Sequence, residues 1–223
     1  MRVGWLLVGA ADVPEGDGWL SAGERDVQAG LRFPKRRSDW RLGRWTAKRA
    51  VAAFLGGPEP TAVEVVAAGD GAPEALVDGL PAGVAISISH RDGNALCAVA
   101  GSDASLGCDL EAVEPRSDAF VRDYFTPAEV QLIDGVPAGE RDVLVTLVWS
   151  AKESALKALR TGLRVDTRSV EVDALDGDGS TWGPVSVRQA ADDRSFAGWW
   201  RRQDDLVMTV LAGSAAVHLE PIG

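Results

Sequence analysis

The chain changes twice from a helical pattern to a strand-like pattern, and this order restricts its fold class more than any other feature. From about Asp39, apolar residues recur at helical spacing until Gly56–Gly57 ends the segment. A second helical segment extends from about Glu140 to Arg160. Strand-like segments follow each helix. Helices and strands separated in this way predict an α+β fold of two similar halves, residues 1–112 and 113–223, although no clear sequence repeat is visible.

Shorter elements complete both halves. Capping boxes, in which Ser or Thr is followed three residues later by Glu, predict helix starts at Ser21 and Thr126. Gly, Pro and Asp predict a loop over residues 67–83. Short turns separate three strand-like segments, which predict an antiparallel meander of residues 84–89, 95–100 and 105–113. The other expected strands are residues 3–8, residues 63–67 and a series within 169–219.

The composition limits the classes of partner. The 223-residue chain carries a net charge of −10, which argues against nucleic acid and anionic membranes as partners but permits a local basic pocket. Cys97 and Cys108 are too few for a disulfide framework or a cysteine-based metal site, so we expect free thiols and a cytoplasmic protein. The apolar start of the chain favours a buried first strand over a minimal signal peptide. No segment approaches the roughly 20 apolar residues of a membrane span.

Two carboxylates stand close together in the segment Gly107-Cys108-Asp109-Leu110-Glu111. Side chains alternate along a strand, so Cys108 and Leu110 would enter a core while Asp109 and Glu111 share the other face. A divalent cation such as Mg²⁺ would relieve the repulsion between the two carboxylates. Taken alone, the motif favours the alternative, which is an acidic strand face in water.

The segment "VWSAKESALKALR" supplies a third carboxylate. Helical spacing places Trp149, Glu153 and Lys157 along one face. The alternative is an ordinary surface Glu–Lys pair, worth only about 0.3–0.5 kcal/mol. Because Trp149 lies on the same stripe, this face is expected to pack against another element.

Two further clusters carry positive charge or can bind phosphate. His90 lies between Ser89 and Arg91 at a strand end, and the alternative is a purely structural histidine. Seven of the fifteen residues from Lys35 to Arg49 are basic, in a chain that is acidic overall. A solvated helix face is the default interpretation of such a run. The contrast with the rest of the chain favours an anion site that uses guanidinium groups, the candidates being Arg36, Arg37, Arg41 and Arg44.

In combination these segments resemble a known family. "GCDLEAVEPR" followed by "WSAKESALKAL" resembles the paired signature of the 4′-phosphopantetheinyl transferases, in their Sfp-like branch. "ISISHRDGNALCAVA" and "LGRWTAKRAV" resemble two further family segments, so the likeness spans residues 33–160. Two positions depart from the family pattern. Ala72 stands where many members have Lys or Arg before Pro73, and Arg91 replaces a serine.

The resemblance implies a fold, a reaction and a set of site residues. The fold is two pseudo-symmetric halves with the active site in the cleft between them. The reaction transfers 4′-phosphopantetheine from coenzyme A to a serine of an apo acyl or peptidyl carrier protein and releases 3′,5′-ADP, with Mg²⁺ as cofactor. The implied metal ligands are Asp109, Glu111 and Glu153. The implied contacts to coenzyme A are Arg36, Arg37, Arg44, Ser89, His90, Asp109, Lys152 and Lys157.

The implied catalytic residues are Glu153, Lys157 and Glu111. Lys157 would stabilise the leaving group, and the base would be Glu153 or a metal-bound water relayed by Glu111. The K-E-S form resembles enzymes of secondary metabolism, with polyketide or nonribosomal peptide carriers. We expect a monomer that docks its carrier on residues 121–133. Two alternatives remain, a Mg²⁺-dependent nucleotide phosphohydrolase and a non-catalytic relative that binds coenzyme A or carriers.

Overall fold

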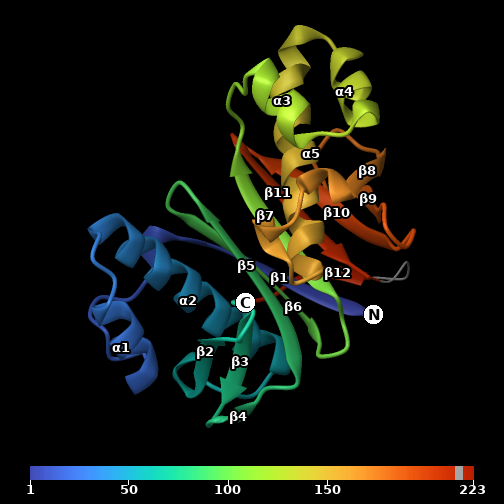
Figure 1. Cartoon of the computed structure of the whole chain (residues 1–223). Helices are drawn as coiled ribbons and strands as arrows, with labels where there is room; N and C mark the ends of the chain where they lie inside the picture. Colours follow the sequence, from blue (N-terminus) through green and yellow to red (C-terminus); the bar gives the residue numbers. More distant parts are fainter. Residues whose placement is uncertain (214–217) are drawn as a thin grey trace. The chain divides into compact units, whose positions relative to one another are not determined.

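The protein is described by a computed structural model that covers residues 1–213 and 218–223. Its helices and strands divide into two compact units, one formed by residues 1–104 and 218–223 and the other beginning at Ser105. Each unit packs helices against one face of a mainly antiparallel sheet (Figure 1), which confirms the expected α+β class. The part of the expected strand series that falls on residues 214–217 lies outside the described residues. In the described ranges, no helix combines the length and apolar character needed to cross a membrane.

The first unit is built around one long helix, α2 (Pro34–Leu55), which begins at a proline and ends at Gly56 in the left-handed region. Ala47, Ala50 and Val51 on its inner face are fully buried in the core of this unit. The short helix α1 (Ala22–Ala29) precedes it. The strands, in sheet order, are β12 (His218–Pro221), β1 (Arg2–Gly9), β6 (Asn94–Gly101) and β5 (Val84–Arg91), with β2 (Val63–Ala67), β3 (Pro73–Val77) and β4 (Leu80–Pro81) in a separate small sheet.

The second unit repeats this plan around α5 (Ala138–Ala158), which is preceded by α3 (Asp118–Tyr124) and α4 (Pro127–Asp134). Val145, Val148 and Ala155 of α5 are fully buried against the sheet. The strands, in sheet order, are β7 (Leu106–Ala112), β11 (Leu206–Ala212), β10 (Ser195–Gln203), β9 (Gly183–Gln189) and β8 (Val170–Leu175).

The two units share one chain order, in which a first strand is followed by short helices, a long helix and a series of strands. The last long strand returns to pair antiparallel with the first, β6 with β1 and β11 with β7. The expected similarity of the two halves is therefore visible in their topology. The difference is that β8 and β9 continue the main sheet, whereas β2 and β3 form their own sheet with β4.

Two local predictions differ from the structure. The expected loop over residues 67–83 contains β3 and β4, because two tight turns with positive φ at Gly71 and Gly79 fold this segment into a meander beside β2. The expected meander of residues 84–113 is only a hairpin of β5 and β6, because β7 pairs with β11.

The expected boundary between the halves is displaced for the same reason. β7 carries the D-x-E motif and belongs to the second unit, so the boundary lies before Ser105 rather than after residue 112. Residues 218–223 return to the first unit, where β12 pairs in parallel with β1. Pairing between strands far apart in the chain leaves no local trace in the sequence, so this displacement could not be predicted from periodicity.

Candidate active site

A glycine lets α5 approach β7 closely, and this approach organises the carboxylates of the second unit. A Cβ atom on Gly107 would lie 1.8 Å from the carbonyl oxygen of Ser154 and 2.8 Å from the amide nitrogen of Ala158. Any side chain there would push the helix away. Asp109 and Glu111 alternate with Gly107 on the same face of β7 and are therefore held beside α5, as the strand pattern predicts.

The carboxylates face the helix stripe predicted from the sequence. Lys157 Nζ lies 2.7 Å from Asp109 Oδ1 and 3.0 Å from the carbonyl oxygen of Cys108. Glu153 Oε2 lies 3.9 Å from the same Nζ. Trp149 Nε1 donates a hydrogen bond of 3.2 Å to Glu111 Oε1. The structure thus brings Trp149, Glu153 and Lys157 together with both strand carboxylates, so neither an acidic strand face in water nor a simple surface Glu–Lys pair describes this cluster.

Hydroxyl groups that the sequence analysis did not select lie beneath this cluster. Thr209 of β11 is the partner of Asp109 across the sheet. Its Oγ1 lies 2.9 Å from Ser150 Oγ and 2.7 Å from Ser154 Oγ, and all three side chains are fully buried. These contacts fasten β11 to α5 beside Asp109. Arg116 Nη2 lies 3.6 Å from Glu111 Oε2 and adds a second cation.

The proximity of the carboxylates changes the proton affinity of Glu153. Burial, followed by the negative charge of Asp109 and that of Glu111, raises the pKa of Glu153 to about 7, while Lys157 partly opposes the shift. Burial alone would lower the pKa of Lys157, but Asp109 and Glu153 more than offset this, and its pKa is raised. Lys157 is therefore a cation at neutral pH, while Glu153 is poised to gain or lose a proton.

The donor set suits a hard cation, since Mg²⁺ prefers carboxylate oxygens and keeps sites for water and phosphate. The side chains as placed are not a preformed metal cage: across residues 1–213 and 218–223, no three His, Cys, Asp or Glu side chains are arranged to hold an ion. Instead, Lys157 contacts Asp109 and Glu153. The chemistry of the residues thus fits Mg²⁺, and the lysine supplies the counter-charge in the arrangement described.

The fold itself does not require these carboxylates. In the first unit, Gly4 takes a place similar to that of Gly107: a Cβ on Gly4 would lie 2.6 Å from Ile222 and 3.1 Å from Phe54 of α2. Counting along the strands from these two glycines, Asp109 and Glu111 correspond to Leu6 and Val8, which are buried in the apolar core. Burying charged groups costs free energy even when they are paired, and the apolar residues of the first unit avoid that cost, so the polar face of β7 indicates a functional site.

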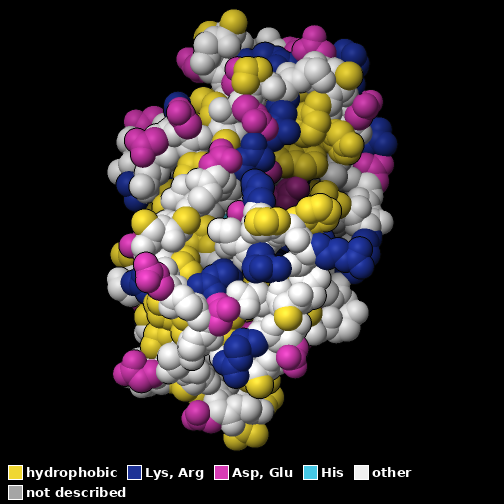
Figure 2. Space-filling view, turned by 90° about the vertical axis from the view of Figure 1, so that its left-hand side faces the viewer, with side chains coloured by type: hydrophobic (Ala, Val, Ile, Leu, Met, Phe, Trp, Pro, Cys, Tyr) yellow, Lys and Arg dark blue, Asp and Glu magenta, His cyan; other side chains and the backbone are white. Residues whose placement is uncertain are grey.

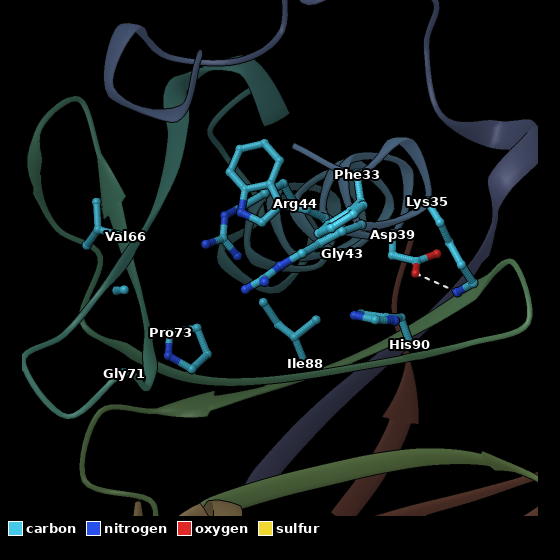
Figure 3. Close-up of a pocket in the computed structure, with 13 residues that line it drawn as sticks. Phe33, Lys35, Asp39, Gly43, Arg44, Val66, Gly71, Pro73, Ile88 and His90 are labelled. Atoms are coloured by element: carbon cyan, nitrogen blue, oxygen red, sulfur yellow. Dashed lines mark hydrogen bonds and ion pairs between the residues drawn. The ribbon is translucent and has the colours of Figure 1, made fainter. Parts of the chain in front are cut away.

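The first unit contains a pocket of about 610 Å³, within the usual size range of small-molecule sites. Figure 3 shows Arg44 pointing into the space between α2 and the strands, with Val66, Gly71 and Pro73 on one side and Lys35 and His90 on the other. The lining residues are Phe33, Lys35, Arg36, Asp39, Trp40, Gly43, Arg44, Val66, Ala67, Gly71, Pro73, Ile88 and His90. The pocket therefore combines an apolar wall with basic side chains.

Arg44 is the most deeply placed cation of this pocket. Its guanidinium lies 4.9 Å from the ring centre of Trp40, and burial lowers the pKa of Arg44, with Glu24 partly opposing the shift. Its Nε is buried and has no hydrogen-bond partner within the described part of the chain. A buried guanidinium with an open donor is suited to a phosphate or carboxylate of a ligand. Figure 2 shows Lys and Arg side chains interspersed with acidic side chains on the face in view.

Only some of the predicted nucleotide contacts line this pocket. Arg36, Arg44 and His90 line the pocket. Arg37 instead donates a hydrogen bond to the carbonyl of Leu31. Strand alternation puts Ser89 on the face of β5 opposite His90, so its role stays a prediction. Phe33 and Trp40 were not predicted as pocket residues, although two aromatic residues flanking the basic residues 35–37 are a signal for them.

Two of the predicted basic residues have structural partners instead. Arg41 pairs with Asp17 and donates to the carbonyl of Pro14. Lys152 was expected to face phosphate, but it is fully buried. Its Nζ lies 2.6 Å from Glu129 Oε2 and 2.7 Å from the carbonyl oxygen of Val170. Lys152 is therefore corrected to a buried structural cation, because α5 turns this side chain away from the stripe that carries Glu153 and Lys157.

The second unit also contains a partly apolar pocket of about 520 Å³. Phe120 and Tyr124 contribute aromatic walls, with ring centres 4.9 Å apart, and Trp149 closes the pocket beside them. Trp149 is the residue that holds Glu111. This pocket therefore adjoins the carboxylate cluster.

Comparison with known proteins assigns the family. A model described as the 4′-phosphopantetheinyl transferase superfamily matches residues 105–210, and one described as the 4′-phosphopantetheinyl transferase N-terminal domain matches residues 29–100. The chain belongs to the 4′-phosphopantetheinyl transferase superfamily. The two matches cover the carboxylate cluster and the basic pocket respectively, with the N-terminal domain typical of the Sfp-like architecture.

Individual relatives are more distant. The chain is 29% identical over 133 residues to the 4′-phosphopantetheinyl transferase HetI of Nostoc sp. (strain PCC 7120 / SAG 25.82 / UTEX 2576). This alignment covers 59% of the chain and spans only 55% of the relative's length. The crystal structure of Thermotoga maritima holo-[acyl-carrier-protein] synthase aligns with 24% identity and a TM-score of 0.35, over 56% of this chain and 74% of that one.

Proposed function

We propose that the protein transfers the 4′-phosphopantetheine group of coenzyme A to a serine hydroxyl of an apo acyl or peptidyl carrier protein and releases 3′,5′-ADP. The observation that carries this proposal is the contact of Lys157 with Asp109 and Glu153, inside the segment that matches the family. It joins a permanent cation to a carboxylate whose pKa lies near neutrality. Phosphoryl transfer needs both, a cation for the leaving group and an acceptor for the proton of the nucleophile.

In the proposed binding mode, the pocket of the first unit takes the nucleotide end of coenzyme A. Trp40 and Phe33 offer flat apolar surfaces for a base. Arg44, Arg36 and His90 supply donors for the 3′-phosphate. Gly71 and Pro73 lie in the same pocket, where many family members have a basic residue between them. Ala72 cannot make such a contact, so any polar contact from this loop comes from its backbone.

In the proposed reaction, side chains of this protein supply the base and the cation. The serine oxygen of the carrier attacks the phosphorus that bears the pantetheine arm, and the bond from that phosphorus to the bridging oxygen breaks. Glu153 is proposed to accept the serine proton. Lys157 stabilises the negative charge that develops on the departing 3′,5′-ADP. Mg²⁺, held by Asp109, Glu111 and Glu153, would supply further neutralisation of the pyrophosphate.

The carrier is proposed to dock on residues 121–133, as the sequence predicts. Tyr124 and Leu132 are large apolar side chains in this segment, 42% and 43% exposed. An exposed apolar surface is needed because the enzyme is acidic, and charge attraction to an acidic carrier is absent. The K-E-S form favours a polyketide or nonribosomal peptide carrier.

The test is a loading assay with the protein, coenzyme A, Mg²⁺ and a panel of apo carriers, read by mass spectrometry. Transfer adds one phosphopantetheine group to a carrier. The alternative of a nucleotide phosphohydrolase uses water in place of serine, so it would release 3′,5′-ADP from coenzyme A without a carrier. A non-catalytic relative would bind coenzyme A and leave every carrier unchanged.

A further inference from the structure

Each unit contains one buried Glu–Lys pair that the proposed reaction does not use. Glu24 and Lys48 of the first unit are 2% and 0% exposed, and Lys48 Nζ lies 2.7 Å from Glu24 Oε2. Glu129 and Lys152 of the second unit are 1% and 0% exposed, with a corresponding distance of 2.6 Å. Burying an ion pair costs desolvation, and an apolar pair of similar size is often as stable. Two such pairs in one chain therefore require an explanation.

The two pairs make the same set of contacts. Each Glu is the third residue of a short helix and accepts a hydrogen bond from the backbone of the capping residue, Ser21 or Thr126. Each Lys lies in the long helix and donates to the carbonyl of the first residue of a strand, Val63 of β2 or Val170 of β8.

The remaining glutamate oxygen completes each network. Glu24 Oε1 accepts from the amide of Val65 at 3.0 Å, and Glu129 Oε1 accepts from the amide of Val172 at 2.8 Å. A short helix, a long helix and a strand are thus joined at one buried point in each unit.

The sequence carries this device twice. Trp-Thr-Ala-Lys at residues 45–48 corresponds to Trp-Ser-Ala-Lys at residues 149–152, and Val-Glu-Val at residues 63–65 recurs at residues 170–172. The capping boxes Ser-x-x-Glu and Thr-x-x-Glu complete the match. The lengths of chain between these short matches differ in the two units, so the repeat is not visible in the sequence alone. The shared contacts reveal it.

In the first unit, the pair joins two walls of the basic pocket. Lys48 follows Arg44 by one helical turn, so it fixes the part of α2 from which Arg44 enters the pocket. Glu24 holds the amide of Val65, and the next two residues of β2, Val66 and Ala67, line the opposite wall. The network of Glu24 and Lys48 therefore sets the separation of the walls.

In the second unit, the pair holds the helix of the carboxylate cluster. Lys152 directly precedes Glu153, and Trp149 and Lys157 lie within about one and a half helical turns of it. Its bond to Val170 ties α5 to the segment that contains Thr167, which lines the aromatic pocket together with Trp149.

We propose that Glu24–Lys48 and Glu129–Lys152 are equivalent positioning pairs, the first adjusting the nucleotide pocket and the second adjusting Glu153 and Lys157 for transfer. This inference rests on the proposed function. Hydrogen bonds at fixed geometry in a low-dielectric core favour one arrangement of the joined elements. A displacement of about 1 Å at a catalytic group can reduce a rate roughly a hundredfold. Lys152, which the family signature places beside Glu153, thereby acts through Glu153 rather than on the substrate.

The test compares double variants that remove the charges together. Glu24→Gln with Lys48→Met should weaken coenzyme A binding at least about tenfold, measured by calorimetry, and change kcat less than about twofold. Glu129→Gln with Lys152→Met should lower kcat at least about tenfold and leave coenzyme A affinity unchanged. Glu220→Gln with Arg2→Met is the matched control, because this half-exposed pair on β12 and β1 lies outside both networks, and it should change neither quantity.

Folding is monitored by thermal unfolding. Hydrogen exchange over residues 149–157 reports the position of α5 without any activity, and exchange should rise in the second double variant alone. If a double variant fails to fold, Glu24→Asp or Glu129→Asp replaces it, since aspartate keeps the charge but has a shorter side chain. The same losses of coenzyme A affinity or of kcat are then expected. Folded variants with wild-type values, or equal losses of affinity and kcat in both pairs, would overturn the inference. A wild-type protein that loads no carrier contradicts the proposed function instead, while calorimetry and exchange still test the pairs.

Discussion

Lys157 of α5 and Asp109 of β7 are 48 residues apart in the chain, yet their Nζ and Oδ1 atoms lie 2.7 Å apart. Asp109 is only 2% exposed, so the lysine is its main counter-charge within the described cluster. We predict that Lys157→Met lowers kcat by about a hundredfold or more, because the leaving group loses its cation. Steady-state transfer at saturating coenzyme A measures this loss. A variant with wild-type kcat would remove Lys157 from the mechanism.

Gly107 is predicted to be required for the approach of α5 to β7. The Gly107→Ala variant would place its Cβ 1.8 Å from the Ser154 carbonyl oxygen. We expect a loss of unfolding free energy of at least about 1–3 kcal/mol, as for overpacked cores, together with loss of transfer.

Gly139→Ala is the matched control, because a Cβ there meets no atom within 4 Å and α5 gains helix propensity. Chemical denaturation compares the two variants. Equal stability of Gly107→Ala and wild type would contradict the packing described for α5.

Arg44 is predicted to recognise the 3′-phosphate of coenzyme A. Arg44→Met removes a charge-assisted contact worth about 1.5–3 kcal/mol, so coenzyme A should bind roughly 10- to 100-fold more weakly. Dephospho-coenzyme A, which lacks that phosphate, should bind wild type and variant equally well. Arg37→Met is the neighbouring control and should leave the affinity near that of wild type, since its guanidinium bonds to the Leu31 carbonyl. Equal weakening for both nucleotides would assign Arg44 to another part of the ligand.

The raised pKa of Glu153 predicts a pH dependence of stability in protein kept free of metal by a chelator. A carboxyl group whose folded pKa is about 7 stabilises the fold fully below its ordinary value near 4.5, and this contribution is lost as pH rises to about 7. The unfolding free energy should fall across that range by up to about 3 kcal/mol. In Glu153→Gln the fall should be absent. Parallel curves for the two proteins would show that Glu153 titrates normally.

Removal of divalent cations tests the proposed cofactor separately. Excess chelator should abolish transfer, and Mg²⁺ added back should restore it, because three carboxylates need neutralisation beyond that given by Lys157. Asp109→Asn should raise the Mg²⁺ concentration needed for half-maximal transfer. Full turnover in excess chelator would show that transfer does not require Mg²⁺.

Local patterns predicted the elements well where they carry their own signals. The capping boxes at Ser21 and Thr126, the end of α2 at Gly56 and the shared face of Asp109 and Glu111 all follow from residues near in sequence. The partner of β7 could not be predicted in this way, because pairing with β11 depends on residues about 100 positions away.

The surroundings of individual side chains also could not be predicted from the sequence. Lys152 and Lys157 stand five residues apart in one helix and have the same chemistry. Only tertiary packing assigns one to a buried pair with Glu129 and the other to Asp109. The sequence therefore selects the residues of a site better than it assigns their partners.

The most direct test of the central claim is the mass of an apo carrier protein after incubation with this protein, coenzyme A and Mg²⁺. The proposed function predicts a carrier that gains the mass of one phosphopantetheine group on its serine, with one 3′,5′-ADP released for each carrier modified. An unchanged mass across the whole panel of carriers, while a known transferase loads them under the same conditions, would contradict it.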